Sequence, residues 1–131
     1  MTQTLFSKYK EAIANFTDVK DRENFLVKDC GEQRIYYAPF DYVNPKAKLF
    51  VIGITPGEQQ MENMMVEAKR LIRLGLSDEE IQKKCKPIGS FSGGMRKNLV
   101  AMMDHIGLAD YLGIESTSEL FDKHVELGNL T

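Results

Sequence analysis

The chain has 131 residues, 43% of them hydrophobic and 27% charged, which is enough apolar material for one folded domain. Its 17 basic and 19 acidic side chains leave a formal charge of -2, which excludes a protein that coats nucleic acid through an excess of Lys and Arg. No stretch resembles a secretory leader or approaches the roughly 20 apolar residues of a membrane span, so we expect a cytoplasmic protein without membrane contacts.

The N-terminal part of the chain predicts one helix followed by short extended segments. Apolar side chains recur at three- and four-residue steps over residues 5–16, which indicates a helix with one buried face. Residues 25–27 and 34–40 have the composition of short strands or ordered loop, and Pro39 ends the second of them.

The clearest strand is predicted at residues 48–54. An unbroken apolar run fills residues 49–52 and stops at Gly53, which is typical of a parallel strand covered on both faces. In open α/β sheets the ligand site lies just beyond the carboxyl end of such a strand. Residues 53–60 are therefore the first place to look for a site.

Two helices are expected next. A helical stripe over residues 61–74 ends at Gly75, a plausible left-handed C-terminal position. Ser77 and Glu80 form a capping-box pattern ahead of a short helix that reaches about Lys84 and is closed by Pro87.

The remaining elements begin with a glycine-rich loop at residues 89–94, which leads into a helix over residues 95–105. We expect four apolar side chains of that helix to face the core: Leu99, Met102, Met103 and Ile106. A second capping-box pattern, Ser116 with Glu119, follows. The tail at residues 124–130 predicts the start of a second core strand.

Two loops are candidates for a binding site. In the loop after the strand, glycines let a flat ligand approach the backbone and Pro56 fixes the loop, although a tight strand-to-helix turn accounts for the same residues and is favoured for this loop taken alone. In the glycine-rich loop, N–H groups near Gly93 and Gly94 at a helix N-terminus can hold a phosphate, with Arg96 and Lys97 adding charge. Phe91 in that loop is by default a core residue.

Taken together, the two loops resemble the motifs of the uracil-DNA glycosylase superfamily, over residues 48–112 and with a helical insertion at residues 61–84. The matching positions are Gly53, Ile54, Thr55, Pro56 and Gly57 for the Pro-Gly loop, and Phe91 with Gly93 for the segment that stacks on an extruded base. Gln60 is a looser match to polar residues that touch the base. The resemblance implies a three-layer α/β/α domain over residues 1–131, with a short, mainly parallel sheet that is incomplete at its C-terminal side.

The same resemblance implies a hydrolase that cleaves the N-glycosidic bond of a flipped uracil or modified base in single-stranded or duplex DNA, as in base-excision repair. Thr55 would position the attacking water. The base would be surrounded by Gly53, Ile54, Pro56, Gly57, Gln60 and Phe91. A flanking phosphate would be held by Gly93, Gly94, Arg96 and Lys97. No cofactor is implied, and Cys30 and Cys85 have no His at metal-ligand spacing, so we expect reduced thiols and no metal.

Several positions depart from the superfamily pattern. Thr55 stands where many members have Asp or Asn, and Ile54 stands where other branches have an acid, so both familiar carboxylates are absent. Asn129 fits the start of the strand that carries a base-reading Asn, but we expect the terminal His loop to be missing. His105 and His124 are more simply structural or solvated. The alternatives are therefore a non-catalytic nucleic-acid- or protein-binding module from a truncated or split fold, and an oligomer in which a second chain completes the sheet.

Overall fold

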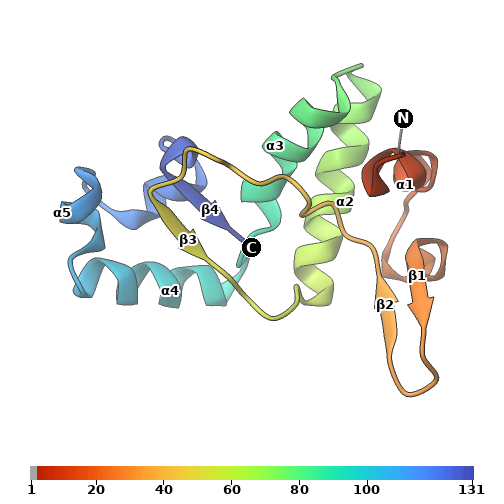
Figure 1. Cartoon of the computed structure of the whole chain (residues 1–131), viewed down its shortest axis with the longest axis horizontal. Coiled ribbons are helices and arrows are strands. Elements are labelled where there is room, and N and C mark those ends of the chain that lie inside the picture. Colours follow the sequence, from red (N-terminus) through yellow and green to blue (C-terminus); the bar gives the residue numbers. More distant parts are fainter. Residues whose placement is uncertain (1–2) are drawn as a thin grey trace.

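The computed structural model describes residues 3–131 and is mixed α/β, with helices predominating. Helix α1 (Leu5–Ala14) begins where the Thr4 hydroxyl accepts a hydrogen bond from the Ser7 N–H at 3.1 Å. A 3-10 helix, η1 (Val19–Phe25), leads into the antiparallel pair of β1 (Leu26–Asp29) and β2 (Arg34–Tyr36). This hairpin projects away from the helices that follow it (Figure 1).

Two long helices follow in the chain and lie side by side (Figure 1). Helix α2 spans Glu58–Arg73 and helix α3 spans Asp78–Gly89. Gly75 between them has a φ of 76°, as the expected left-handed position requires, and the capping box of Ser77 with Glu80 is present.

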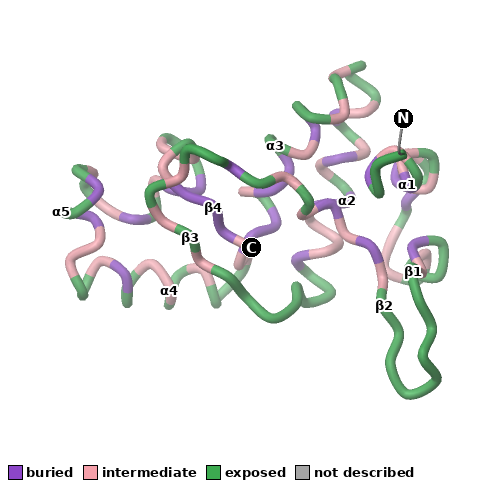
Figure 2. Tube along the Cα trace, viewed as in Figure 1, coloured by how far each residue is buried: buried purple, intermediate pink, exposed green. Residues whose placement is uncertain are grey.

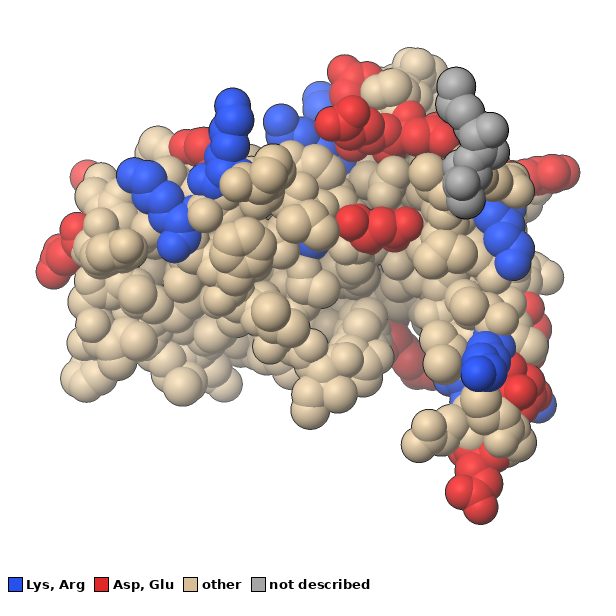
Figure 3. All heavy atoms as spheres, viewed as in Figure 1, with Lys and Arg blue, Asp and Glu red and all other residues tan. Residues whose placement is uncertain are grey.

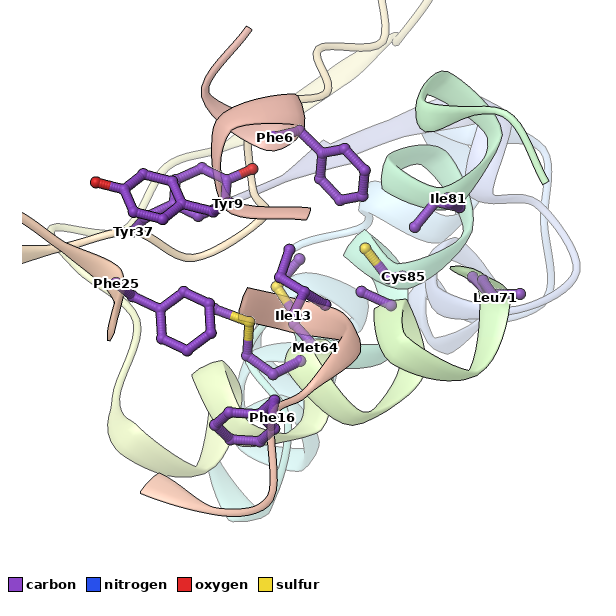
Figure 4. Packing of buried hydrophobic residues seen from close by; sticks show 12 residues of the cluster. Phe6, Tyr9, Ile13, Phe16, Phe25, Tyr37, Met64, Leu71, Ile81 and Cys85 are labelled. Atoms are coloured by element: carbon purple, nitrogen blue, oxygen red, sulfur yellow. The ribbon is translucent and has the colours of Figure 1, made fainter. Parts of the chain in front are cut away.

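The first core is enclosed by α1, α2 and α3, with Phe25 at the end of η1 and Tyr37 just after β2 (Figure 4). Tyr9 stacks on Tyr37 with ring centroids 4.9 Å apart, and Phe25 packs against Tyr9 and Phe16. Its buried members are Phe6, Tyr9, Ile13, Phe16, Phe25, Tyr37, Met64, Met65, Ala68, Leu71, Ile81 and Cys85. Burial raises the pKa of the Cys85 thiol to about 12, which makes it an unreactive core residue.

The second part of the chain is built on a parallel strand pair. Strand β3 (Leu49–Val51) pairs with β4 (Gly128–Leu130), so that segments nearly at opposite ends of this half meet. Helices α4 (Gly94–His105) and α5 (Leu108–Leu112) and the 3-10 helices η2 (Thr117–Phe121) and η3 (Val125–Leu127) complete it. A second, smaller core lies between α4, η2 and the strands. The prediction of a strand in the tail is confirmed.

The prediction that residues 48–54 form a strand covered on both faces is wrong. Strand β3 is shorter, Phe50 is 49% exposed and Ile52 is 79% exposed. Leu49 and Val51 point into the second core, whereas nothing in residues 3–131 covers the face that carries Phe50. The apolar run therefore has one buried and one open face.

Two helix predictions also need correction. Helix α3 does not stop before Pro87 but continues to Gly89, because the Ser90 N–H donates to the carbonyl of Lys86 at 2.9 Å and holds the last turn. In α4, Met103 is buried as expected, but Met102 and Ile106 are exposed, since the second core reaches only the neighbouring face of the helix. Among the described helices, none is long and apolar enough to cross a membrane.

Candidate functional site

The two predicted loops meet at the end of β3. A Cβ atom placed on Gly53 would lie 3.6 Å from the Phe91 ring and 3.2 Å from the carbonyl oxygen of Thr131. The Gly53 N–H also donates to that carbonyl, which extends the β3–β4 pairing by one step. The contact with the ring is an ordinary van der Waals distance, whereas the approach to the Thr131 carbonyl is tight, so Gly53 leaves room for the bonded strand ends rather than for the ring.

Phe91 reaches Gly53 from an unusual backbone conformation. Its φ is 51°, the left-handed region that bulky residues rarely adopt. Its side chain is half-buried and packs on the second core, so part of the ring is already used for packing. The remaining part borders the open loop after β3.

Thr55, Pro56 and Gly57 lie elsewhere, in a shallow cavity of about 270 Å³ beside the β1–β2 hairpin. The other walls of that cavity include Arg22, Arg34, Tyr36 and Glu58, but not Phe91. The structure thus brings Phe91 to Gly53 and does not bring it to Pro56. The slot expected between Pro56 and Phe91 is not formed as one cavity.

The surroundings of Thr55 contain no free acid or base. Its hydroxyl is 3.5 Å from the carbonyl oxygen of Pro56, a long contact, and Thr55 and Ile54 are both exposed. The carboxylate in the cavity wall, Glu58, is paired with Arg22 at 3.0 Å. Within the part of the chain described, Thr55 can hold a water molecule but has no neighbour that would activate it.

Gln60 has a structural role that the sequence did not reveal. Its side-chain oxygen accepts a hydrogen bond from the Gly57 N–H at 3.0 Å and so closes the first turn of α2. Its amide nitrogen points to the sulfur of Met95 at 4.0 Å, and the residue is buried. Gln60 is consequently turned into the protein and away from the exposed loop where a base would lie.

Arg96 is also occupied. Its guanidinium donates to the carbonyls of Pro87, Ile88 and Ser90 at 2.7, 3.1 and 2.6 Å, and it lies 4.3 Å over the Phe121 ring. It therefore caps the C-terminal end of α3 and links it to the second core. Burial lowers the pKa of Arg96.

Gly93, Gly94 and Lys97 remain exposed at the start of α4. Gly93 has a φ of 88° and lets the chain turn into the helix. Phosphate binding at this end of α4 stays a prediction. It now rests on Gly93, Gly94 and Lys97, because the donors of Arg96 are used by backbone carbonyls.

A larger cavity that the sequence did not indicate lies on the other side of the strand pair. It measures about 480 Å³ and is lined by residues of the 42–46 segment, α3, η3 and β4, including Asn44, Lys86, Ser90 and Asn129. Lys86 was indistinguishable by pattern from its solvated neighbours Lys83 and Lys84, because a single helix turn does not tell which lysine faces inward. Asn129 lies on β4 as expected, but its side chain contacts Asn44 and Lys86.

No family model matches the chain, and no solved structure matches it. Among curated proteins, the chain is similar to Uncharacterized protein YoxB of Bacillus subtilis (strain 168), with 38% identity over 98 residues. The match takes in 74% of this chain and 38% of the relative. The chain therefore spans well under half the length of the relative that it matches.

Proposed function

We propose that the chain is a non-catalytic protein-binding module that binds a strand-bearing segment of polypeptide at the free edge of β3 and on the open face of α4. The proposal is carried by a surface that we call the apolar edge. Its members are all exposed: Phe50, Ile52, Ile54, Met95, Met102 and Ile106. Exposed apolar surfaces gathered in this way are typical of binding sites.

The free edge belongs to β3 and not to β4. The carbonyls on the outer edge of β4 are covered by side chains, since Ser90 Oγ donates to Leu130 O at 2.6 Å and Asn44 Nδ2 donates to Gly128 O at 3.2 Å. In the described residues β3 has β4 as its only strand neighbour. Parallel strands are normally buried on both faces, and an uncovered edge is a template for strand addition.

The chemistry of the occupant follows from α4. Met95, Met102 and Ile106 are spaced by seven and four residues, so they form one exposed line along the helix, beside the buried Met103. Figure 3 shows a broad area over β3 and α4 that carries no Lys, Arg, Asp or Glu. A docked strand with uncharged, apolar side chains would fit this surface, and methionine can adapt to its shape.

We assign the docked strand to polypeptide of the kind that the Bacillus relative carries outside the matched region, because the match takes in only 38% of that protein. Adding strands at β3 would extend the parallel pair into a larger sheet. Helix α4 would then cover one face of that sheet, which supplies two of the three layers that the resemblance implies.

The experiment is a binding measurement by titration calorimetry between the purified chain and the part of YoxB outside the matched 98 residues. We expect a one-to-one complex that Ile52→Lys and Met102→Lys abolish. Leu74→Lys replaces an equally exposed apolar residue at the end of α2 and should bind as the native chain does. Unchanged binding by Ile52→Lys, or no binding at all, would overturn the proposal. Self-association that the same two substitutions remove would assign the surface to a second copy.

A second candidate function, DNA glycosylase activity, is favoured by the approach of the Phe91 ring to Gly53. In this hypothesis Phe91 stacks on an extruded uracil or modified base at the end of β3, Thr55 holds the attacking water, and the start of α4 near Gly93 and Lys97 contacts a phosphate. Water attacks the sugar carbon as the N-glycosidic bond breaks, the base leaves with the bonding electrons, and the proton lost by the water passes to the departing base.

This candidate is tested with single-stranded and duplex DNA that carries uracil or another modified base. Cleavage by the native chain that Phe91→Ala and Thr55→Ala both abolish would support it. Lys97→Ala should weaken DNA binding without removing cleavage, since Lys97 is exposed and its assigned role is to contact a phosphate and not the base or the water. A folded chain that leaves every such base attached to its sugar would exclude the glycosylase.

A further inference from the structure

The 480 Å³ cavity has the size and composition of a small-molecule site. Its apolar walls are formed by residues such as Leu120, Val125 and Leu130, and its polar groups are concentrated around Lys86 and Asn129. Sites for small ligands are typically concave, of about 300–1,000 Å³, mostly apolar, and supplied with a few polar groups.

Lys86 is a buried cation that lacks an anionic partner. The residue is 5% exposed, and its ammonium donates to the carbonyl of Tyr42 and, at 3.3 Å, to the side-chain oxygen of Asn129. Within residues 3–131 no carboxylate lies within ion-pair distance of it. An ammonium has three donors, so one remains, and a buried ammonium with no carboxylate in contact is costly, even with Asp41 near enough to favour its charged form. Burial lowers the pKa of Lys86 accordingly.

Asn129 supplies a second free donor at the same place. Its side-chain oxygen accepts from the Asn44 N–H at 2.9 Å and from Lys86, which fixes the orientation of the amide. The amide nitrogen has no acceptor in the described part of the chain. It is not among the fully buried atoms there, because every fully buried side-chain nitrogen and oxygen has a partner. That nitrogen is therefore accessible, and Asn129, which is 7% exposed, borders the cavity.

The rim of the cavity favours a negative ligand. Lys46 and Lys83 both line it. The one carboxylate among the lining residues, Glu126, is already held by the His124 ring at 3.0 Å. The cavity thus combines a buried ammonium, a free amide donor and two rim lysines.

We propose that this cavity binds a small carboxylic acid with an apolar body, one carboxylate oxygen accepting from Lys86 Nζ and the other from Asn129 Nδ2. The apolar body lies against Leu120 and Val125. The ligand supplies the missing opposite charge to Lys86 and an acceptor to Asn129 at once. This site is independent of the apolar edge and of the loops at Gly53 and Phe91.

The test follows the side-chain amide signals of ¹⁵N-labelled protein during titration with benzoate, phenylacetate and hexanoate. We expect saturable shifts at the side-chain amides of Asn129 and Asn44. Benzamide, which matches benzoate in shape but carries no charge, should bind about tenfold more weakly. Equal binding of benzamide, shifts confined to the exposed surface, or no shift with any of the three acids would overturn the proposal.

Two variants localise the ligand. Val125→Trp fills the cavity without touching the Lys86 network and should abolish the shifts, whereas Val66→Trp on the exposed side of α2 should leave them unchanged. Lys86→Met removes the ammonium and should weaken benzoate by about tenfold while leaving benzamide unaffected. If Lys86→Met does not fold, the Val125→Trp result decides. Retention of benzoate binding by folded Val125→Trp would place the ligand elsewhere.

Discussion

The two cores of this protein differ in how completely they are closed. The first, around α1, α2 and α3, holds twelve buried residues, most of them fully inaccessible. The second, between α4 and the β3–β4 pair, holds four buried residues and seven half-buried ones packed against them. Figure 2 shows the contrast: buried positions recur along α1 and α2, whereas α4 has one buried residue, Met103, and β3 has only half-buried and exposed ones.

This difference follows from how each core is assembled. Helices α2 and α3 are neighbours in sequence and pack directly on each other, and α1 and the aromatic residues that follow it close the rest of the core. Strand β3 finds its partner only at residues 128–130, and a parallel pair needs covering elements on both faces. The first core is complete in itself, whereas the second keeps part of its apolar surface outside, which is where we place the binding function.

The largest expected effect separates the two cores directly. Phe25 is fully buried, with its ring centroid 6.1 Å from Tyr9 and 6.0 Å from Phe16. We expect Phe25→Ala to lower the free energy of unfolding by about 3–5 kcal/mol, measured by urea titration and circular dichroism. Phe91→Ala in the second core should cost clearly less, because that ring is half-buried. Equal costs would mean that the second core is as closed as the first.

A smaller loss is expected where the two long helices touch. A Cβ atom on Gly89 would lie 2.0 Å from Cγ of the fully buried Met64, so Gly89→Ala must displace that side chain. We expect a loss of about 1–3 kcal/mol in the free energy of unfolding. Gly94→Ala is the matched control, since nothing lies within 4 Å of its added Cβ.

Measuring the free energy of unfolding of a double variant shows whether the cost of Gly89→Ala comes from its contact with Met64 or from the added methyl group in general. Shortening Met64 to Ala should absorb part of the cost, so the double variant should be less destabilised than the sum of the two single variants. Additive costs would show that the clash with Met64 is not the cause.

The sequence predicted those features that depend on neighbouring residues. The capping boxes at Ser77 and Ser116 and the left-handed Gly75 are local, and all three were found where expected. The extent of β3 burial was not predicted correctly, because an apolar run does not record whether a second layer of structure lies over it. The continuation of α3 past Pro87 likewise depends on the hydrogen bond from the Ser90 N–H to the carbonyl of Lys86, which forms only in the folded chain.

The candidate site shows the same division. Sequence alone suggested that the two loops approach each other, and they do meet at Gly53 and Phe91. It could not show that Arg96 is used by carbonyls at the end of α3, or that Gln60 closes a helix turn, because both partners are brought there by folding. Lys86 was missed since a lysine in a polar helix is ordinarily solvated.

The hydrogen bonds between Asp104 on α4 and the start of η2 contribute about 1 kcal/mol to the free energy of unfolding, and this contribution depends on pH. Asp104 accepts hydrogen bonds at 2.7 Å from the Thr117 hydroxyl, the Thr117 N–H and the Ser116 hydroxyl, which hold its pKa below the usual value of 3.8. Because the folded pKa is the lower one, this stabilisation is complete above the unfolded value and is lost as the pH falls through the folded value.

Asp104→Asn should therefore lower the free energy of unfolding at neutral pH and reduce its fall on acidification below pH 4, both measured by urea titration at a series of pH values. Asp110→Asn changes an exposed carboxylate and should reproduce the native profile. A native acid profile in Asp104→Asn would show that these hydrogen bonds between α4 and η2 do not contribute.

The smallest expected effect on stability tests the open face most sharply, through two adjacent methionines of α4. Met103 is 4% exposed and Met102 is 67% exposed. Met103→Gln buries an amide and should cost about 1–3 kcal/mol, whereas Met102→Gln should change the free energy of unfolding by less than about 0.5 kcal/mol. Met102→Gln should nevertheless weaken binding of the YoxB segment, because it places an amide against an apolar strand. If both substitutions destabilise the isolated chain equally, Met102 is covered by the chain itself, and α4 has no open face to offer a partner.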